Sequence, residues 1–204
     1  MNNKFTLQKG QPENAPEIAR LIMMAMSEEC CRHFYGENHT ADDFHALITS
    51  LCEMTDTQYS YANTICAIVD GKIAGISVSY DGGRLHELRR PFVEEVLKRF
   101  GRDFSGMPDE TQTGELYLDS LAVLPHYRGR GIATALLKAT AKRADEMGAG
   151  PVGLLVDKGN PKAEHLYTSV GFHYVDDNLW GGHEMKHLQL STSKTINMTY
   201  HKRK

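Results

Sequence analysis

Two glycines and two arginines stand together directly before a helical pattern. Gly129 and Gly131 alternate with Arg128 and Arg130, and the helical pattern begins at Ile132. The first turn of a helix presents N–H groups without intrahelical acceptors, and it carries the positive end of the helix dipole. Glycine lets a phosphate approach those groups, and arginine adds charge-assisted hydrogen bonds. The pattern therefore predicts a phosphate or diphosphate site.

Two familiar nucleotide-binding motifs are excluded for this turn. The dinucleotide-binding fingerprint G-x-G-x-x-G needs a third glycine at the position that Thr134 occupies. The P-loop motif G-x-x-x-x-G-K-[ST] is absent from the sequence. On these residues alone, a turn that binds no ligand remains an equal alternative.

The segment from Asn160 to Phe172 holds a second candidate for chemistry. Asn160 followed by Pro161 is typical of a helix N-cap with proline at the first helical position. Two interpretations stand for Tyr167. Its helical spacing with apolar neighbours is typical of a core residue. Alternatively its hydroxyl, which has an ordinary pKa of about 10 and keeps its proton at neutral pH, has a functional role.

A strand expected over residues 115–124 places polar side chains on one face. Alternation puts Glu115, Tyr117 and Asp119 on the same side as Leu121. The two carboxylates are candidates for binding a cationic amine or for relaying its proton through water. A solvated carboxylate without a role is the alternative for each, and we expect His126 to be a surface residue.

The elements that would position these residues follow from periodicity and turn signals. In chain order we expect a strand over 5–9, helices beginning near 16 and 40, strands over 64–69 and 72–80, a helix over 84–100, a strand over 115–124, a helix over 132–147, a strand over 152–156, a helix over 160–170, and strands over 172–175 and 183–190. The Asp70-Gly71 dipeptide predicts a hairpin, and we expect 101–114 to be a mobile loop. The order predicts a mixed α/β domain.

Composition narrows the class of protein. The 204 residues suit one domain, and a formal net charge of −3 does not favour nucleic acid as the main partner. We expect no membrane span and no signal peptide. The four cysteines form no CxxC pair, so we expect free thiols, no metal site and a cytoplasmic location. The oligomeric state stays open, with a homodimer among the options.

Taken with its surroundings, the turn resembles the acetyl-CoA-binding motif of the GNAT superfamily of N-acetyltransferases. The motif [Arg/Gln]-x-x-Gly-x-[Gly/Ala] is matched by Arg128, Gly131 and Ala133, and the element N-x(6)-Y-x(3)-GF is matched from Asn160 to Phe172. The resemblance implies a mixed, mostly antiparallel sheet of about seven strands, flanked by helices, with a splayed central strand pair. It implies an acetyltransferase domain over 1–190, an inserted helix and loop over 84–114 near the acceptor side, and a loosely attached polar tail over 191–204.

The resemblance also implies roles for individual residues. Tyr167 would be the general acid, and Asn160 would contact the coenzyme arm. The remaining coenzyme-binding residues would be Leu121, Ala122, Val123, Arg128, Gly129, Arg130, Gly131, Ile132, Ala133 and Thr134. The implied co-substrate is acetyl-CoA, and the implied acceptor is an amine.

The general base departs from the family's patterns. Some members carry a catalytic Glu where Tyr117 stands by spacing, and others carry one where Leu155 stands. Neither Glu is kept. Two functions are therefore weighed: an N-acetyltransferase that acetylates a primary amine by direct attack, and a catalytically weak regulatory module that binds acyl-CoA.

Overall fold

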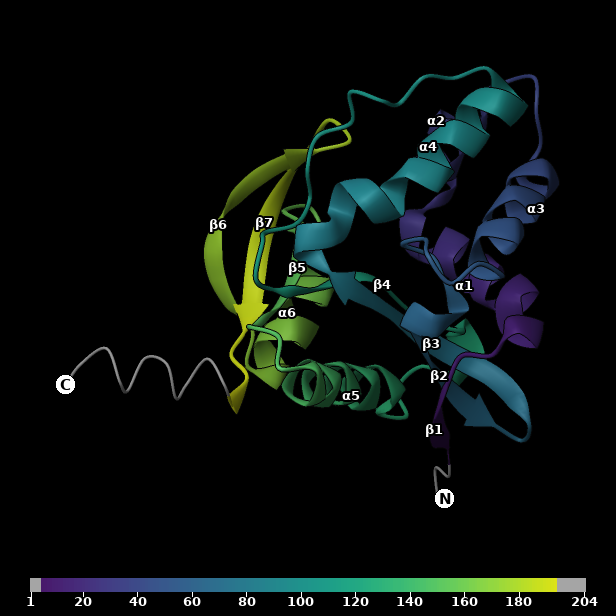
Figure 1. Ribbon diagram of the computed structural model, residues 1–204. Coiled ribbons are helices and arrows are strands. Elements are labelled where there is room, and N and C mark those ends of the chain that lie inside the picture. The colour runs from purple at the N-terminus through teal and green to yellow at the C-terminus, as the bar shows by residue number, and fades with distance from the viewer. Residues whose placement is uncertain (1–4, 194–204) are drawn as a thin grey trace. The chain divides into compact units, whose positions relative to one another are not determined.

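The computed structural model describes residues 5–193, and Figure 1 shows its elements. The helices are α1 (Ala15–Met26), α2 (Glu28–Tyr35), α3 (Ala41–Cys52), α4 (Leu85–Phe100), α5 (Ile132–Met147) and α6 (Pro161–Val170). The strands are β1 (Thr6–Lys9), β2 (Thr64–Val69), β3 (Lys72–Asp81), β4 (Leu116–Val123), β5 (Val152–Asp157), β6 (His173–Trp180) and β7 (His183–Leu190).

Seven strands form one sheet in the order β1-β2-β3-β4-β5-β7-β6. β4 pairs with β5 in parallel, whereas β1 with β2, β2 with β3, β5 with β7 and β6 with β7 are antiparallel. The parallel register joins Leu116 to Val152 and Tyr117 to Gly153, at the start of two strands that both continue further. This arrangement confirms the predicted mixed, mostly antiparallel sheet.

The chain forms two compact units, which are described in turn. The first unit comprises Met1–Val78, Leu85–Met107 and Ser120–Leu136, and the second comprises Ser79–Arg84, Pro108–Asp119 and Leu137–Lys204. In the first unit, β2 and β3 form the predicted hairpin. Asp70 and Gly71 have φ of 48° and 75°, which is the backbone that a tight hairpin turn of this kind requires.

Helices α2, α3 and α4 of the first unit pack through an aromatic cluster. Phe34 of α2 lies 4.9 Å from Phe92 of α4 and 6.0 Å from Phe44 of α3, measured between ring centroids. Helix α2 was not predicted, because its eight residues, EECCRHFY, are too few to show a helical period. The signal that could have found it is Ser27, whose hydroxyl accepts from Cys30 N–H as an N-cap.

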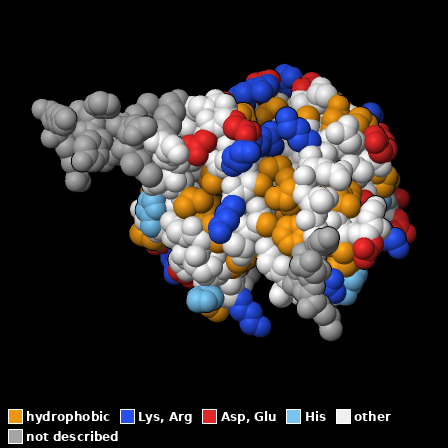
Figure 2. All heavy atoms as spheres, turned by 90° about the horizontal axis from the view of Figure 1, so that it is seen from below, with side chains coloured by type: hydrophobic (Ala, Val, Ile, Leu, Met, Phe, Trp, Pro, Cys, Tyr) orange, Lys and Arg blue, Asp and Glu red, His pale blue; other side chains and the backbone are white. Residues whose placement is uncertain are grey.

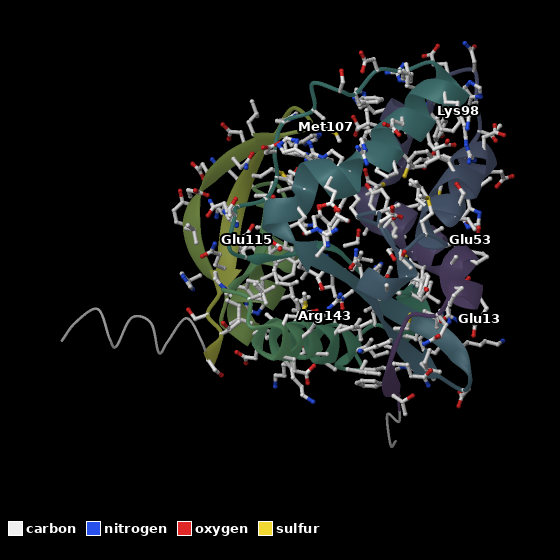
Figure 3. All side chains as sticks on the ribbon, in the orientation of Figure 1. Glu13, Glu53, Lys98, Met107, Glu115 and Arg143 are labelled. Atoms are coloured by element: carbon white, nitrogen blue, oxygen red, sulfur yellow. The ribbon has the colours of Figure 1, made fainter. Side chains whose placement is uncertain are left out.

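The second unit contains the β6–β7 hairpin at the end of the sheet, seen at the yellow end of the colour scale in Figure 1. β6 runs to Trp180, five residues beyond the predicted end at Val175, because its polar second half pairs with β7 throughout. The second part of α5 also belongs to this unit. There the guanidinium of Arg143 lies 3.5 Å from Ser79 Oγ, and burial lowers the pKa of Arg143 (Figure 3).

The segment after α4 is anchored at both ends. Phe104 lies 4.9 Å from Phe34 between ring centroids in the first unit. In the second unit the indole N–H of Trp180 donates to Glu110 Oε2 at 3.0 Å. The expectation of a freely mobile loop therefore does not describe these two residues, whose side chains pack on defined partners.

The expected loose tail is only partly within the described residues. Thr192 Oγ1 donates to Gly150 O at 3.1 Å, and the backbone N–H of Ser193 donates to Asp145 at 2.8 Å. The first residues of the expected tail therefore form hydrogen bonds with the second unit, and 194–204 lie outside the described part.

All four cysteines are free, as predicted, and three of them are buried. Burial raises the pKa of the Cys31 and Cys66 thiols to about 12, so they are inert apolar packing groups. Within residues 5–193, no helix is long and apolar enough to cross a membrane. Charged side chains of both signs lie at the surface that Figure 2 presents.

Candidate active site

The glycine-containing turn opens α5 in the first unit. Gly129 and Gly131 have φ of 75° and 78°, and a Cβ built on either would meet no atom within 4 Å. The glycines are thus required by backbone conformation rather than by crowding, because side-chain-bearing residues rarely adopt such φ values. The helix begins at Ile132, and its first bond runs from Ala135 N–H to Gly131 O at 3.0 Å. Residues 128–131, which precede the helix, are exposed.

The two arginines brace this turn from within. Arg128 Nε donates to Val123 O at 3.0 Å, and Arg130 Nη2 donates to His126 O at 3.2 Å. The Arg130 guanidinium also lies over the Tyr127 ring, 5.1 Å from its centroid. Each guanidinium carries five N–H donors, so both keep donors for an anion. The arginines therefore stabilise the conformation of the turn and also give it positive charge.

The end of β4 leads into the turn. Ala122 and Val123 are buried, and Leu124 N–H donates to Ala74 O of β3 at 2.9 Å. A Cβ on Gly75 would lie 2.7 Å from Ala122 O, so glycine is required for the two strands to approach there. Val123 packs with Ile132 and Leu136 in one apolar cluster, which fixes the strand to the helix on either side of the turn.

Tyr167 belongs to helix α6 of the second unit. Asn160 caps the helix, as predicted, by accepting from Ala163 N–H at 3.1 Å. Gly171 ends it with φ of 111°, and Phe172 N–H returns to Tyr167 O at 3.1 Å. The Tyr167 and Phe172 rings lie 5.7 Å apart between centroids. The helix ends thus fix the backbone of Tyr167.

The Tyr167 side chain is half-buried, and burial raises the pKa of its hydroxyl to about 12. The hydroxyl therefore keeps its proton throughout the neutral range. A tyrosine in this state can donate a proton, and it cannot act as an anionic base.

Tyr117 stands on β4 where some family members have a glutamate. It is buried, and its ring lies 5.7 Å from the Tyr80 ring between centroids. Burial, and then the negative charges of Glu110, Asp119 and Glu115, raise the pKa of Tyr117 well above 10. This tyrosine cannot replace a glutamate as an ionised base at neutral pH.

Glu115 directly precedes β4, and its carboxylate is fully engaged. Its Oε2 lies 2.9 Å from His187 Nε2 and accepts from Gln189 Nε2 at 2.9 Å, while Oε1 accepts from Gln112 N–H at 2.8 Å (Figure 3). A Cβ on Gly153 would overlap Glu115 Oε2, so glycine leaves the space that the carboxylate fills. Glu115 is therefore a buried anchor and not a solvated carboxylate.

His187 lies between the buried carboxylate of Glu115 and the exposed carboxylate of Asp176. Its Nδ1 lies 3.2 Å from Asp176 Oδ1, and the side-chain exposures of Glu115, His187 and Asp176 are 1%, 1% and 51%. A β-bulge at Val175 re-aims β6 so that Asp176 stands opposite His187. A neutral imidazole has one N–H, whereas both ring nitrogens face carboxylate oxygens, so the imidazolium satisfies both.

The electrostatics of His187 agree with that geometry. Burial acts to lower the pKa of His187, but the hydrogen bond and charge of Glu115 and the charge of Asp176 outweigh it, so the pKa is raised. Sequence reasoning missed His187, Asp176 and Gln189. The available signal was the alternation of His187 and Gln189 along one face of β7, opposite Lys186 and Leu188.

Within residues 5–193, no group of three or more His, Cys, Asp or Glu side chains is arranged to hold a metal ion. The chemical groups in place are backbone N–H donors at a helix start, two arginines, a protonated tyrosine and carboxylates beside β4. These groups suit binding of a phosphorylated ligand and proton donation to a leaving group. The sheet order, with one parallel pair among antiparallel pairs, is that of the acyl-CoA N-acyltransferase fold.

Comparison with known proteins agrees with this class. The sequence model described as Acetyltransferase (GNAT) family matches residues 23–172, and the chain belongs to that family. Among solved structures, "The crystal structure of acetyltransferase" has a TM-score of 0.76 at 28% identity and covers 92% of this chain and 100% of its own. An N-acetyltransferase from Staphylococcus aureus Mu50 has a TM-score of 0.77 at 25% identity, covering 91% and 100%.

Sequence relatives match over a shorter stretch. The thialysine N-epsilon-acetyltransferase of Mus musculus is 40% identical over 62 residues, covering 30% of this chain and 36% of the relative. The streptothricin acetyltransferase of Streptomyces lavendulae is 36% identical over 69 residues, covering 33% and 36%. The chain therefore spans about a third of the length of these two relatives.

Proposed function

We propose that this chain transfers an acetyl group from acetyl-CoA to a primary amine. The observation that carries the proposal is the exposed turn at the start of α5, with Gly129 and Gly131 at positive φ, in a chain of the GNAT family. A helix start with free access for an anion is what a coenzyme with a diphosphate requires. Acetyl-CoA supplies the activated acetyl group as its thioester.

The coenzyme-binding roles follow the family's motifs. Backbone groups from Arg128 to Thr134 hold the pyrophosphate, and the two arginines add charge. Backbone groups of Leu121, Ala122 and Val123 pair with the pantetheine arm, and Asn160 contacts the same arm. The N-cap bond of Asn160 to Ala163 uses its Oδ1, so its side-chain NH₂ is the group assigned to the coenzyme.

The reaction is a direct attack by a neutral amine on the thioester carbonyl. The C–N bond forms, negative charge develops on the carbonyl oxygen, and backbone N–H groups of β4 stabilise that charge. The C–S bond then breaks, and Tyr167 donates its proton to the departing thiolate. The raised pKa of Tyr167, about 12, keeps that proton in place before the transfer. No covalent enzyme intermediate is needed.

The proton lost by the amine needs an acceptor. Tyr117 is excluded as an anionic base by its raised pKa, and Glu115 is held by three donors. We assign the relay to Asp119, which is half-buried on the same face of β4, acting through water. Glu115 then fixes the start of β4 and takes no part in the proton transfer.

The acceptor is proposed as a primary amine on a small molecule or on a protein. Among relatives, one is named for the N-epsilon position of thialysine, one for the N-alpha position and one for streptothricin, and the first two positions are amine nitrogens. We also propose a cytoplasmic location, on the evidence of four unpaired thiols.

A panel of amines tests the proposal. Acetyl-CoA is incubated with thialysine, streptothricin, spermidine or a short peptide that has a free N-terminus, and released CoA is measured with a thiol reagent. We expect amine-dependent release with at least one of them. If calorimetry shows that acetyl-CoA binds but no amine causes release of CoA, the result favours the alternative function, a regulatory module that binds acyl-CoA. If acetyl-CoA does not bind, the placement of the coenzyme site is wrong.

A further inference from the structure

Helix α6, which carries Tyr167, lies near the surface of the second unit. Every one of its residues keeps exposed surface, and none is fully buried. Apolar burial is the usual source of helix stability in a folded protein. The position of Tyr167 therefore depends on the polar and close-packed contacts that attach α6 to its neighbours.

One such contact is an ion pair with β7. Lys186 Nζ lies 2.7 Å from Glu164 Oε1 and 2.9 Å from Oε2, so it contacts both carboxylate oxygens. The two side chains are 31% and 29% exposed. This is intermediate between the exposed pairs elsewhere on the chain and a buried pair, so solvent screens it only in part. The ion pair therefore attaches Glu164 of α6 to Lys186 of β7.

A second contact lies near the other end of the helix. A Cβ built on Gly171 would lie 3.3 Å from Leu190 Cδ1, so the helix end sits tightly against β7. Alternation along β7 puts Lys186 and Leu190 on the same face of the strand. The two contacts therefore seat α6 along one face of β7, at two separate points. Tyr167 lies between them, three residues after Glu164 and four before Gly171.

We propose that Glu164 and Lys186 are positioning residues, which hold the Tyr167 hydroxyl in the orientation for proton donation to the thiolate. This rests on the acid role of Tyr167 in the proposed function. Glu164 and Tyr167 are neighbours on the helix surface, because residues three apart share a face. Rotation or sliding of α6 along β7 would move the hydroxyl directly, and misplacement on the scale of an ångström is costly for a reacting group.

The test is a double-mutant cycle with acetyl-CoA and thialysine as probes. Lys186→Met keeps the length of the side chain and removes its charge, and we expect kcat to fall about fivefold while the KM for acetyl-CoA changes little. The exchanged pair Glu164→Lys with Lys186→Glu should recover most of the loss. Lys142→Met, which breaks an exposed Lys–Glu pair of α5 at 3.4 Å, is the matched control and should leave kcat unchanged.

The decisive readout is coupling to Tyr167. In a Tyr167→Phe background, Lys186→Met should have no further effect on kcat, because there is no hydroxyl left to position. If Tyr167→Phe slows turnover and the two losses multiply, the positioning role is overturned while the acid role stands. If Tyr167→Phe does not change turnover, the acid role itself fails and the positioning role fails with it.

Amide hydrogen exchange gives a readout that needs no acceptor. We expect Lys186→Met to speed exchange across residues 161–170, with no such change in Lys142→Met. Unchanged exchange in α6 would overturn the inference, whatever amine the enzyme uses.

Discussion

The turn from Arg128 to Thr134 is proposed to bind an anion, and the cluster around Glu115 holds a buried carboxylate. The two regions draw their groups from different parts of the chain. The turn uses consecutive residues: two glycines with positive φ, two arginines and the start of a helix. The cluster uses Gln112, Glu115, Gly153, Asp176 and His187, which meet only in the folded sheet. Residues 128–131 of the turn are exposed, whereas Glu115 and His187 at the centre of the cluster are buried.

The difference implies that the turn contributes mainly to ligand binding and the cluster mainly to the stability of the fold. An exposed loop that awaits an anion contributes little to the folded state in its absence. A buried carboxylate and imidazolium are costly to separate, because each loses its partner in a medium that solvates it poorly. Substitutions in the turn should therefore lower ligand affinity more than stability, and substitutions in the cluster should do the reverse.

The largest effect is expected for His187→Leu. It leaves Glu115 buried without its charged partner, and loss of one member of a buried pair costs about 3–5 kcal/mol. Urea denaturation measures the free energy of unfolding. Asp176→Asn is the control, because Asp176 is 51% exposed and its loss should cost much less. Equal losses in the two variants would contradict a buried anchor.

The next effect is expected for Gly131→Val. A β-branched side chain at φ of 78° strains the turn and blocks the approach of a phosphate, so acetyl-CoA affinity should fall on the order of 100-fold, about 2.7 kcal/mol. Calorimetry measures the affinity. Gly101→Val imposes similar strain at φ of 67° in open space after α4. If it weakens acetyl-CoA binding equally, the turn is not the coenzyme site.

Tyr167→Phe should have a smaller but specific effect, a fall in kcat of about tenfold or more, because proton donation by a side chain contributes on the order of 10²–10⁴ and water can replace part of it. Acetyl-CoA affinity should change little. Steady-state kinetics across neutral pH separate the two quantities. A turnover equal to that of the wild type would remove Tyr167 from the mechanism.

The smallest effect is a pH dependence of stability from His187. Because the folded-state pKa of His187 is raised above its ordinary value of about 6.5, its stabilising contribution is complete below that value. It is lost as pH rises through the folded-state pKa. The groups that face His187 are the carboxylates of Glu115 and Asp176. Chemical denaturation at successive pH values should show a decline that His187→Gln lacks.

The same difference explains how much the sequence predicts. The turn, the N-cap at Asn160, the hairpin at Asp70-Gly71 and the helix over 132–147 depend on residues close together in the chain, and the structure confirms them. The mixed, mostly antiparallel sheet of about seven strands was predicted from resemblance to a family rather than from periodicity. Local patterns carry local structure, because helix caps and tight turns are decided by a few neighbouring residues.

What the sequence did not predict depends on pairing across the sheet. The second half of β6 reads as polar, and it becomes a strand because β7 pairs with it. The partners of Glu115 could not be found by spacing, since His187 is reached only through the register of β5 with β7 and the bulge at Val175. Tertiary contacts decide such positions, and a single sequence does not display them.

Gly153 makes two distant positions interdependent over evolutionary time. The space that its missing Cβ leaves is occupied by the Glu115 carboxylate. Alanine at 153 would require a shorter residue at 115 or a side chain that points elsewhere. His187 would then lose the carboxylate that raises its pKa. We therefore expect changes at these positions to appear jointly among descendants of this chain, so that a library that varies residue 153 alone would yield mostly unstable proteins.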